Sequence, residues 1–397
     1  MKKIFLVMLM VLMFITACSG KEVSNKENAP GVTNDSVKIG AWLPLTGPAA
    51  VYGTTQRAGI EAYFEMLNSK GGVKNRKIEF KIEDGGRDPQ QTVAAAKKLI
   101  GRDNVFAIVN SFGTANTEAT FSYVLDEQNV PVLNVFGGLL NWWQPARENL
   151  YGVMVPYEDQ TFALGRWAAK EGAKNILVVH NDPAVYVAEA EMVPPGAKTI
   201  DPNVQVNLMP VKLGTTDYTP IALEAVNSKP DAIVLVQPID EVVAFAKALD
   251  RQNVKIPLYT FAANVTQDTL KLGGKAVDGL HGVSWTVPPT HDSPAVEEYR
   301  QALKKHDPKS IPDFQSLYTW AESMIFAEVL NQVEGDLTRE SFIKALENLK
   351  DYKTDILPPV TFSSENHMGG TAIQRVKVEN GKWKAVGDFI EPTSNWE

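Results

Sequence analysis

The chain has 397 residues, of which 44% are hydrophobic and 22% are charged, and its formal net charge is −8. These proportions are those of an ordinary globular protein. The acidic balance argues against nucleic acid as a partner, because binding to nucleic acid rests on clustered Lys and Arg. Cys18 is the only cysteine, which excludes a disulfide within the chain.

The N-terminus has the features of an export signal. Two lysines precede an unbroken apolar run, residues 4–15, which has the length of a signal-peptide core. It is shorter than the roughly twenty residues that span a bilayer. Small residues then precede Cys18, in a pattern that resembles the lipobox of bacterial lipoproteins. The resemblance implies a signal peptide over 1–17 and a diacylglyceryl group on Cys18 that anchors an extracytoplasmic protein to the bacterial membrane. A buried core thiol is the less favoured interpretation.

A polar segment follows the cysteine. Residues 19–35 hold almost no large apolar side chain, so we expect 18–35 to form a lipidated cysteine with a flexible tether. The folded body is expected to begin near Ser36 and to end before a polar tail, 391–397. Roughly 360 residues remain for the body, which exceeds what one hydrophobic core usually organises and favours two domains.

The body alternates short apolar runs with helical patterns, which is typical of parallel sheets covered by helices. The predicted strands are residues 37–45, 78–82, 105–109, 132–135, 176–179, 204–208, 233–236 and 258–261. A helix is predicted over 54–68, where apolar residues recur with a spacing of about 3.6 residues. Further helices are predicted to begin after an aspartate cap, at 90–100 after Asp88, 160–171 after Asp159 and 241–252 after Asp240.

The order of elements changes after about residue 290. Helices are predicted over 294–306, 313–333 and 339–349 with no strand between them. Two final strands, 373–379 and 382–388, are joined by Asn380-Gly381, a dipeptide that favours a type I′ hairpin. We therefore expect the chain to return to an earlier domain at its end.

The loops after the predicted strands are the candidate ligand site, because open parallel sheets bind ligands beyond the carboxyl ends of their strands. Residues 44–53 and 110–116 form two loops of small residues that lead into helices. Backbone N–H groups at such positions are suited to a carboxylate. Taken singly, each loop is equally well explained as a tight turn.

Several segments together resemble the leucine/isoleucine/valine-binding protein family of type I periplasmic binding proteins. They are PLTGPAAVYG, NSKGGVKNRKIEFKIEDGGRDP with the following QQTVAAAKKLI, NSFGT, NVPVLNVFGG and PYEDQ. The resemblance covers most of residues 36–390 in the same order. It implies an α/β fold of two Rossmann-like lobes with parallel sheets, joined by a three-strand hinge. Lobe I would comprise 36–156 plus 287–360, and lobe II 157–286 plus 361–390.

The resemblance also implies the residues that hold a ligand between the lobes. The carboxylate-holding loop of the family corresponds to Ser111, Phe112, Gly113 and Thr114. A second backbone segment corresponds to Phe136, Gly137 and Gly138, where Gly138 replaces a side chain that often carries a hydroxyl. The aromatic walls correspond to Tyr52 in lobe I and to Tyr157 and Tyr186 in lobe II.

One position departs from the family pattern. Amino-acid-binding members place an acidic residue where this chain has Phe261-Ala262. A buried ammonium group without a partner is strongly disfavoured. The ligand is therefore equally well predicted as a small hydrophobic amino acid or as an aromatic or aliphatic carboxylate without an ammonium group. Phe261, Trp285 and Tyr318 are expected to be either apolar walls of the site or core residues.

These observations predict a monomeric solute-binding lipoprotein that delivers its ligand to an ABC permease. An enzyme is not expected, because the chain lacks the G-x-G-x-x-G, P-loop and G-x-S-x-G motifs. No cofactor is expected, and the five histidines show no spacing suited to a metal ion. The alternative is a ligand-sensing lipoprotein that feeds a signalling receptor, since the same fold serves both roles. A receptor would usually continue into a transmembrane helix, whereas this sequence ends in a polar tail.

Overall fold

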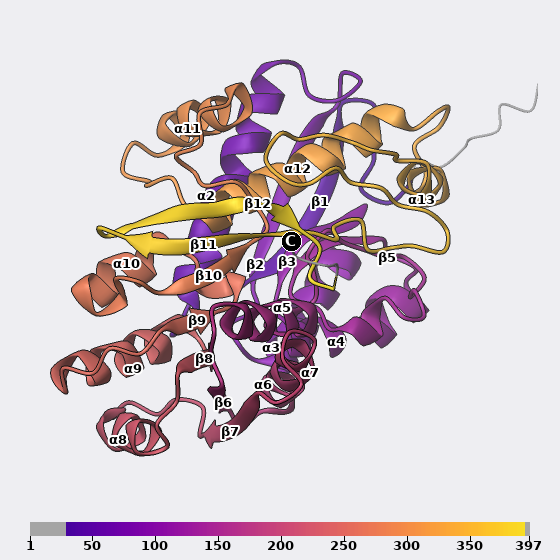
Figure 1. The fold of residues 1–397 in the computed structure, drawn as a ribbon. Coiled ribbons are helices and arrows are strands. Elements are labelled where there is room, and N and C mark those ends of the chain that lie inside the picture. The colour runs from indigo at the N-terminus through magenta and orange to yellow at the C-terminus, as the bar shows by residue number, and fades with distance from the viewer. Residues whose placement is uncertain (1–28, 394–397) are drawn as a thin grey trace, which may run out of the picture.

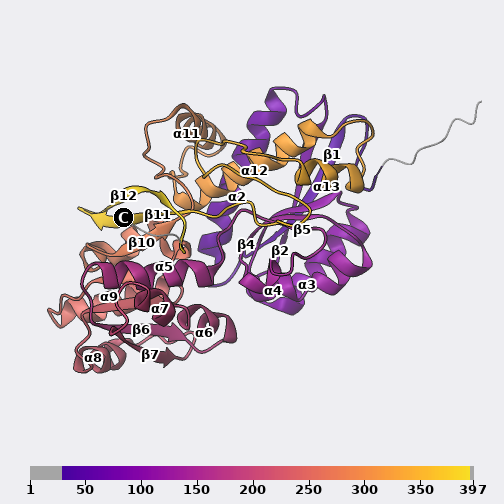
Figure 2. The ribbon, with the colours of Figure 1, turned by 45° about the vertical axis from the view of Figure 1, so that its right-hand side comes forward.

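The computed structural model describes residues 29–393 and contains two β-sheets. Cys18, the predicted signal peptide and most of the predicted tether lie outside the described residues. The first sheet has five strands in the order β2-β1-β3-β4-β5, and the second has seven in the order β12-β11-β10-β9-β8-β6-β7. The sheets lie in separate halves of the molecule (Figure 1, Figure 2).

The first sheet is parallel throughout. Its central strands are buried almost along their whole length, as expected of a parallel sheet with helices on both faces. The strands are β1 (Ser36–Leu43), β2 (Lys77–Asp84), β3 (Ala107–Phe112), β4 (Val132–Phe136) and β5 (Leu150–Tyr151).

Helices from both ends of the chain cover the first sheet. Late helices α11 and α12 both pack against the early helix α2, and α12 also contacts β3 (Figure 2). We call this sheet with its helices lobe I. Its helices are α2 (Ala50–Ser69), α3 (Pro89–Lys97), α4 (Thr114–Glu118), α11 (Pro294–His306), α12 (Phe314–Gln332) and α13 (Arg339–Glu347), with π-helical turns at Lys98–Arg102 and Ser122–Glu127.

The second sheet has a parallel part and an antiparallel edge. Strands β6 (Asn175–Asn181), β7 (Gln205–Val211), β8 (Ala232–Val236), β9 (Leu258–Thr260) and β10 (His281–Ser284) run parallel. The terminal hairpin of β11 (Ile373–Glu379) and β12 (Lys382–Ile390) pairs antiparallel with β10. Its turn residues Asn380 and Gly381 have φ values of 52° and 70°, as the predicted type I′ turn requires.

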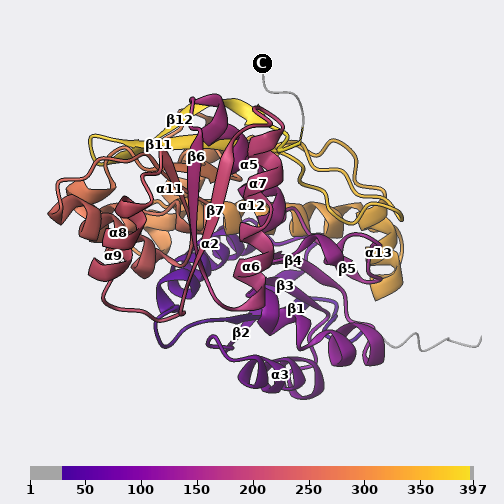
Figure 3. The ribbon, with the colours of Figure 1, turned by 60° about the horizontal axis from the view of Figure 1, so that its bottom comes forward.

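The second sheet and its helices are called lobe II. Figure 3 shows α8 and α9 on one side of its strands and α5, α6 and α7 on the other. The helices are α5 (Tyr157–Lys170), α6 (Ala184–Ala190), α7 (Val193–Lys198), α8 (Thr219–Asn227), α9 (Ile239–Arg251) and α10 (Gln267–Gly273), with 3-10 turns at Ala262–Asn264 and Gly274–Val277. A further 3-10 turn, Leu140–Trp142, lies between β4 and β5 and belongs to lobe I. Within residues 29–393, no helix is both long enough and apolar enough to cross a membrane.

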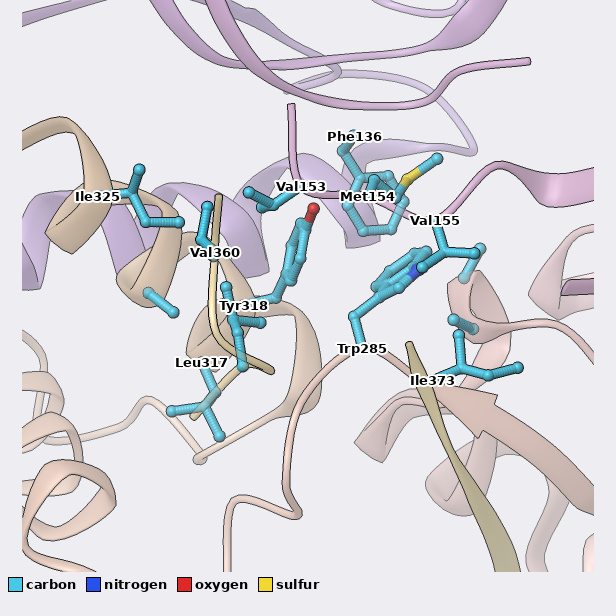
Figure 4. Packing of buried hydrophobic residues seen from close by; sticks show 14 of the residues in the cluster. Phe136, Val153, Met154, Val155, Trp285, Leu317, Tyr318, Ile325, Val360 and Ile373 are labelled. Atoms are coloured by element: carbon cyan, nitrogen blue, oxygen red, sulfur yellow. The ribbon is translucent and has the colours of Figure 1, made fainter. Parts of the chain in front are cut away.

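The chain crosses between the lobes three times, after β5, after β10 and before β11. The crossing segments lie together, since Gly152 pairs with Met368 and the N–H of Val287 bonds to Ile356 O. Figure 4 shows side chains of these segments gathered in one apolar cluster around Trp285. The predicted residue bounds of the two lobes remain predictions.

The structure corrects two predicted helix caps and one strand. Asp88 caps α3 as predicted, because its carboxylate accepts from Gln90 N and Gln91 N. Asp159 and Asp240, in contrast, lie inside the first turns of α5 and α9, which begin after prolines. Acidic residues are also favoured inside a first turn by the helix dipole, so the pattern did not separate the two positions. The strand predicted at 105–109 begins only at Ala107.

Candidate ligand-binding cleft

A cavity of about 210 Å³ lies between the lobes, at the ends of β3 and β4. Eight of the twelve residues predicted to bind ligand line it: Tyr52, Phe112, Gly113, Thr114, Phe136, Tyr157, Tyr186 and Phe261. A larger hollow of about 760 Å³ lies between α2 and α10, but charged residues of both signs line it, and no Phe, Tyr or Trp is among its described lining residues. The smaller cavity is therefore the candidate site.

Aromatic rings form the lobe I wall of the cavity. Phe112 and Phe136 end two neighbouring strands in register, so their rings stack at 5.5 Å with an interplanar angle of 11°. The Tyr52 ring lies 5.7 Å from Phe112. Trp285 lies 5.2 Å behind Phe136, and Tyr318 contacts Trp285. Trp285 and Tyr318 are buried and do not line the cavity, so they are core residues.

Thr114 joins the two predicted polar loops. Its Oγ1 accepts a 3.1 Å hydrogen bond from Gly138 N, while Gly113 N donates to Phe136 O at 2.9 Å. A Cβ on Gly137 would lie 2.8 Å from Thr114 N, and Gly137 has a φ of 154°, so this close approach requires glycine. The loops are held together by these contacts, and the first residues of α4, Thr114, Ala115 and Asn116, line the cavity.

Three of the predicted residues in these loops lie behind the cavity wall. Ser111 is fully buried, and its Oγ accepts a 3.3 Å hydrogen bond from Trp42 N. Gly137 and Gly138 contact Thr114, as described above, and do not line the cavity. The geometry therefore gives Ser111, Gly137 and Gly138 a supporting position rather than a place on the wall.

The lobe II wall comes from α5, α6 and the loop after β9. Tyr157 begins α5, and its ring meets Phe261 edge to face at 5.3 Å. Ala262, predicted at the wall, is turned away from it, and its N–H donates to Gln160 Oε1 at 3.0 Å. The neighbouring Ala263 lines the cavity in its place.

Two hydrogen bonds cross the cleft beside the cavity. Arg87 Nη2 donates to Tyr186 Oη at 2.6 Å, and Ile239 N donates to Tyr52 Oη at 3.1 Å. Burial raises the pKa of Tyr186 to about 12, so its hydroxyl keeps its proton at neutral pH. Arg87 was missed by the sequence analysis, although a basic residue in the loop that follows a predicted strand was an available signal.

Glu189 is the second charged cavity residue that the sequence analysis missed. It lies on α6, three residues after Tyr186, and is 2% exposed. Burial raises the pKa of its carboxyl well above the ordinary value, and the nearby Glu158 carboxyl raises it further. No signal pointed to Glu189, because α6 was not predicted as a helix. Among residues 29–393, no group of three or more metal-ligating side chains is arranged to hold a metal ion.

The family profile described as periplasmic binding protein matches residues 36–382. The chain belongs to this family. Its predicted resemblance to the leucine/isoleucine/valine-binding proteins and its type I fold of two lobes with parallel sheets are thereby confirmed. The family consists of substrate-binding proteins rather than enzymes. Its extracytoplasmic location follows from the same membership.

One curated relative and two solved structures indicate how far the likeness extends. The leucine-, isoleucine-, valine-, threonine-, and alanine-binding protein of Pseudomonas aeruginosa is 38% identical over 93 residues, 23% of this chain and 25% of the relative. The chain therefore matches only a quarter of that relative's length. A fatty acid ABC transporter substrate-binding protein from Thermomonospora curvata has a TM-score of 0.82 at 20% identity, covering 92% of this chain and 95% of its own.

The second structure is a branched chain amino acid ABC transporter protein from Thermus thermophilus with bound valine. Its TM-score is also 0.82, at 15% identity, and the likeness covers 91% of this chain and 97% of that one. At these identities, both structures show the shared fold alone.

Proposed function

We propose that this protein captures a small carboxylate-bearing organic molecule in the cleft and delivers it to an ABC permease. The observation that carries the proposal is the 210 Å³ cavity, whose aromatic walls come from both lobes and whose floor includes the polar loop at Thr114. Its volume is below the roughly 300–1,000 Å³ of pockets for drug-sized ligands, which favours a small ligand. Aromatic walls favour a hydrophobic amino acid or an aromatic or aliphatic acid.

The two solved structures support a ligand with a carboxylate group, but they do not distinguish an amino acid from a simple acid. One neighbour is described with valine and the other as a fatty acid transporter component. Both molecules carry a carboxylate, but only valine carries an ammonium group. The shared chemistry supports the assignment of the Ser111–Thr114 and Phe136–Gly138 loops to an acidic group of the ligand, with Thr114 at the cavity.

In the proposed capture and delivery of the ligand, binding stabilises the closed arrangement of the lobes. Phe112 and Tyr157 contact the ligand together only when lobes I and II are close. A ligand that binds one state better than the other shifts the population toward that state. The closed form is then the one that a permease recognises, and a monomer is sufficient for this delivery.

A thermal-shift screen tests the binding function. The purified chain is heated with hydrophobic amino acids, aromatic acids, aliphatic acids and small amides. A ligand that binds only the folded state raises the Tm in proportion to its concentration relative to Kd. We expect at least one carboxylate to raise the Tm and the amides to have no effect. The proposal fails if no carboxylate changes the Tm.

The lipid anchor at Cys18 is a separate part of the proposal. We expect the wild-type protein to partition into a detergent phase and a Cys18→Ser variant to remain in the aqueous phase, because the acyl chains supply the membrane affinity. Mass spectrometry of the N-terminal peptide identifies the acyl groups. Equal partitioning of the two proteins excludes the anchor but leaves the cleft assignment intact.

A further inference from the structure

The buried side chain of Glu189 has one carboxyl oxygen without a partner among the described residues. Glu189 lines the cavity from α6, and its Oε2 has no hydrogen-bond partner among residues 29–393. No Lys or Arg within that range forms an ion pair with it. A buried carboxyl oxygen without a hydrogen bond, in a group without an ion pair, is costly to the folded state. Such a group at a cavity wall is explained when a ligand supplies the missing donor.

The groups around Glu189 indicate the charge of the ligand group that would donate to it. Glu158 lies close enough for its carboxyl to raise the pKa of Glu189. Glu158 Oε1 accepts from Leu140 N at 3.2 Å, and its Oε2 has no partner within the described residues. The other titratable groups that interact with Glu189 are the hydroxyls of Tyr157 and Tyr186. Glu189 lines the cavity and Glu158 lies behind that wall, so this side of the cavity favours a cationic ligand group.

The opposite wall has the reverse polarity. Lobe I contributes Arg87, which is exposed beside the cavity and donates to Tyr186 Oη, and it contributes the Thr114 hydroxyl. No carboxylate of lobe I lines the cavity within residues 29–393. The cavity therefore offers donors on one side and the Glu189 carboxyl group on the other, an arrangement that matches a ligand with an anionic and a cationic end.

We propose that Glu189 accepts hydrogen bonds from a positively charged nitrogen of the ligand and thereby selects small zwitterions over simple carboxylates. This inference rests on the proposed binding function and deepens it. The acid that amino-acid-binding relatives place at Phe261-Ala262, and that this chain lacks there, is then supplied by a different element, the helix α6. Arg87 and the Thr114 loop then face the carboxylate end, while the rings of Phe112, Phe136 and Phe261 enclose the apolar part.

Matched ligand pairs that differ only in the ammonium group test the inference. Calorimetry compares leucine with 4-methylpentanoate and phenylalanine with 3-phenylpropanoate, on the wild-type chain and on Glu189→Gln. For at least one pair, we expect the amino acid to bind the wild type at least 10-fold more tightly than its partner. Glu189→Gln should weaken the amino acid about 30-fold or more and change the simple acid less than about threefold.

Controls separate this inference from the binding function. Glu191→Gln replaces an exposed glutamate two residues further along the chain and should leave all four affinities unchanged. Circular dichroism and the Tm of the empty protein establish that Glu189→Gln is folded. If simple acids bind the wild type as well as amino acids do, or if Glu189→Gln weakens both members equally, the role of Glu189 is wrong while the binding function stands. If no member of either pair binds, both proposals fail for this ligand class.

Discussion

The hydroxyl of Tyr52 accepts a 3.1 Å hydrogen bond from Ile239 N, and this bond joins α2 of lobe I to the first turn of α9 in lobe II. Tyr52→Phe removes the bond but keeps the ring contact with Phe112. We expect the affinity for a ligand found in the thermal-shift screen to fall about 2- to 10-fold, because a net hydrogen bond contributes about 0.5–1.5 kcal/mol to the closed state. Calorimetry measures the affinity.

A second tyrosine provides the control for this prediction. Tyr123 is half-buried in lobe I and does not line the cavity, so Tyr123→Phe should leave the affinity unchanged. Small-angle scattering of the empty proteins should also show a larger radius of gyration for Tyr52→Phe than for the wild type. Unchanged affinity and radius for Tyr52→Phe would show that this bond does not stabilise closure.

Thr114 is expected to link loop geometry to ligand affinity. Thr114→Val removes the Oγ1 that accepts from Gly138 N, and it removes a hydroxyl from the cavity wall. We expect ligand affinity to fall about 10-fold or more, since a buried N–H loses its acceptor at a cost of about 1–3 kcal/mol. Thr114→Ser keeps the hydroxyl and should retain affinity within about threefold. Equal affinities of the Val and Ser variants in calorimetry would remove Thr114 from the site.

The alternation of strands and helices was sufficient to predict parallel sheets covered by helices, because that pattern is local. The division into two lobes was predicted from chain length and from the family resemblance. Helix α11 was predicted with its observed bounds, since Ser293 and Pro294 provide a cap and a first residue that act locally. Short elements such as β5 and α6 were missed. Their two and seven residues are too few for a periodic signal, and contacts made far along the chain stabilise them.

The residues of the candidate site likewise divide into those that could be predicted from the sequence and those that could not. Loop residues such as Thr114 were predicted because they follow strand ends, and that relation is local. Ser111 and Ala262 occupy the predicted loops but face away from the cavity, and only the packed structure shows which side of a loop faces the cleft. Glu189 was missed because its role at the cavity depends on its burial between the two lobes. A single sequence does not reveal that burial.

Asp313 links the two lobes in a pH-dependent way. Its carboxylate accepts from Gln315 N in α12 and, at 2.5 Å, from Gln267 N in α10. Burial raises its pKa from 3.8 to about 6. Between about pH 4 and 6 the folded chain therefore holds a proton that the unfolded chain releases, so the contribution of Asp313 to the free energy of unfolding falls as pH rises.

Asp313→Asn has no such proton and tests this dependence. The quantity to follow is the difference in free energy of unfolding, wild type minus variant. We expect this difference to fall by about 1–3 kcal/mol from pH 4 to pH 7, since one pKa unit corresponds to about 1.4 kcal/mol. Urea unfolding at both pH values provides the measurement. Asp292→Asn, an exposed site before α11, is the control. A difference that rises with pH would contradict the raised pKa.

The contact between α2 and α12 tolerates no side chain at Gly59. A Cβ there would lie 2.1 Å from Ser316 O and 2.6 Å from Thr319 Oγ1. Gly59→Ala should therefore separate the two helices and lower the free energy of unfolding by about 1–3 kcal/mol or more. The matched variant is Gly101→Ala, whose Cβ has no atom closer than Tyr123 Oη at 3.7 Å. Equal Tm values for the two variants would contradict the close packing.

Binding of an amino acid should release a proton from Glu189. Burial and the Glu158 carboxyl raise the pKa of Glu189, so the empty cleft favours the protonated form of this group. A ligand ammonium requires the ionised form. Leucine affinity should therefore rise with pH, by at most about tenfold per unit, while the affinity of Glu189→Gln stays flat. Titration in phosphate and Tris buffers, which differ in ionisation enthalpy, measures the released proton.

The pH dependence of leucine affinity is assigned to Glu189 only if the other titratable groups near it do not cause it. Burial keeps the hydroxyls of Tyr157 and Tyr186 protonated between about pH 5 and 8, and Arg87 stays charged there. Glu158 is the remaining group, and burial raises its pKa as well. Glu158→Gln removes a neighbouring carboxyl, so it should lower the pKa of Glu189 and move the rise in leucine affinity to lower pH. A rise that survives unchanged in Glu189→Gln but disappears in Glu158→Gln would assign the proton to Glu158 instead.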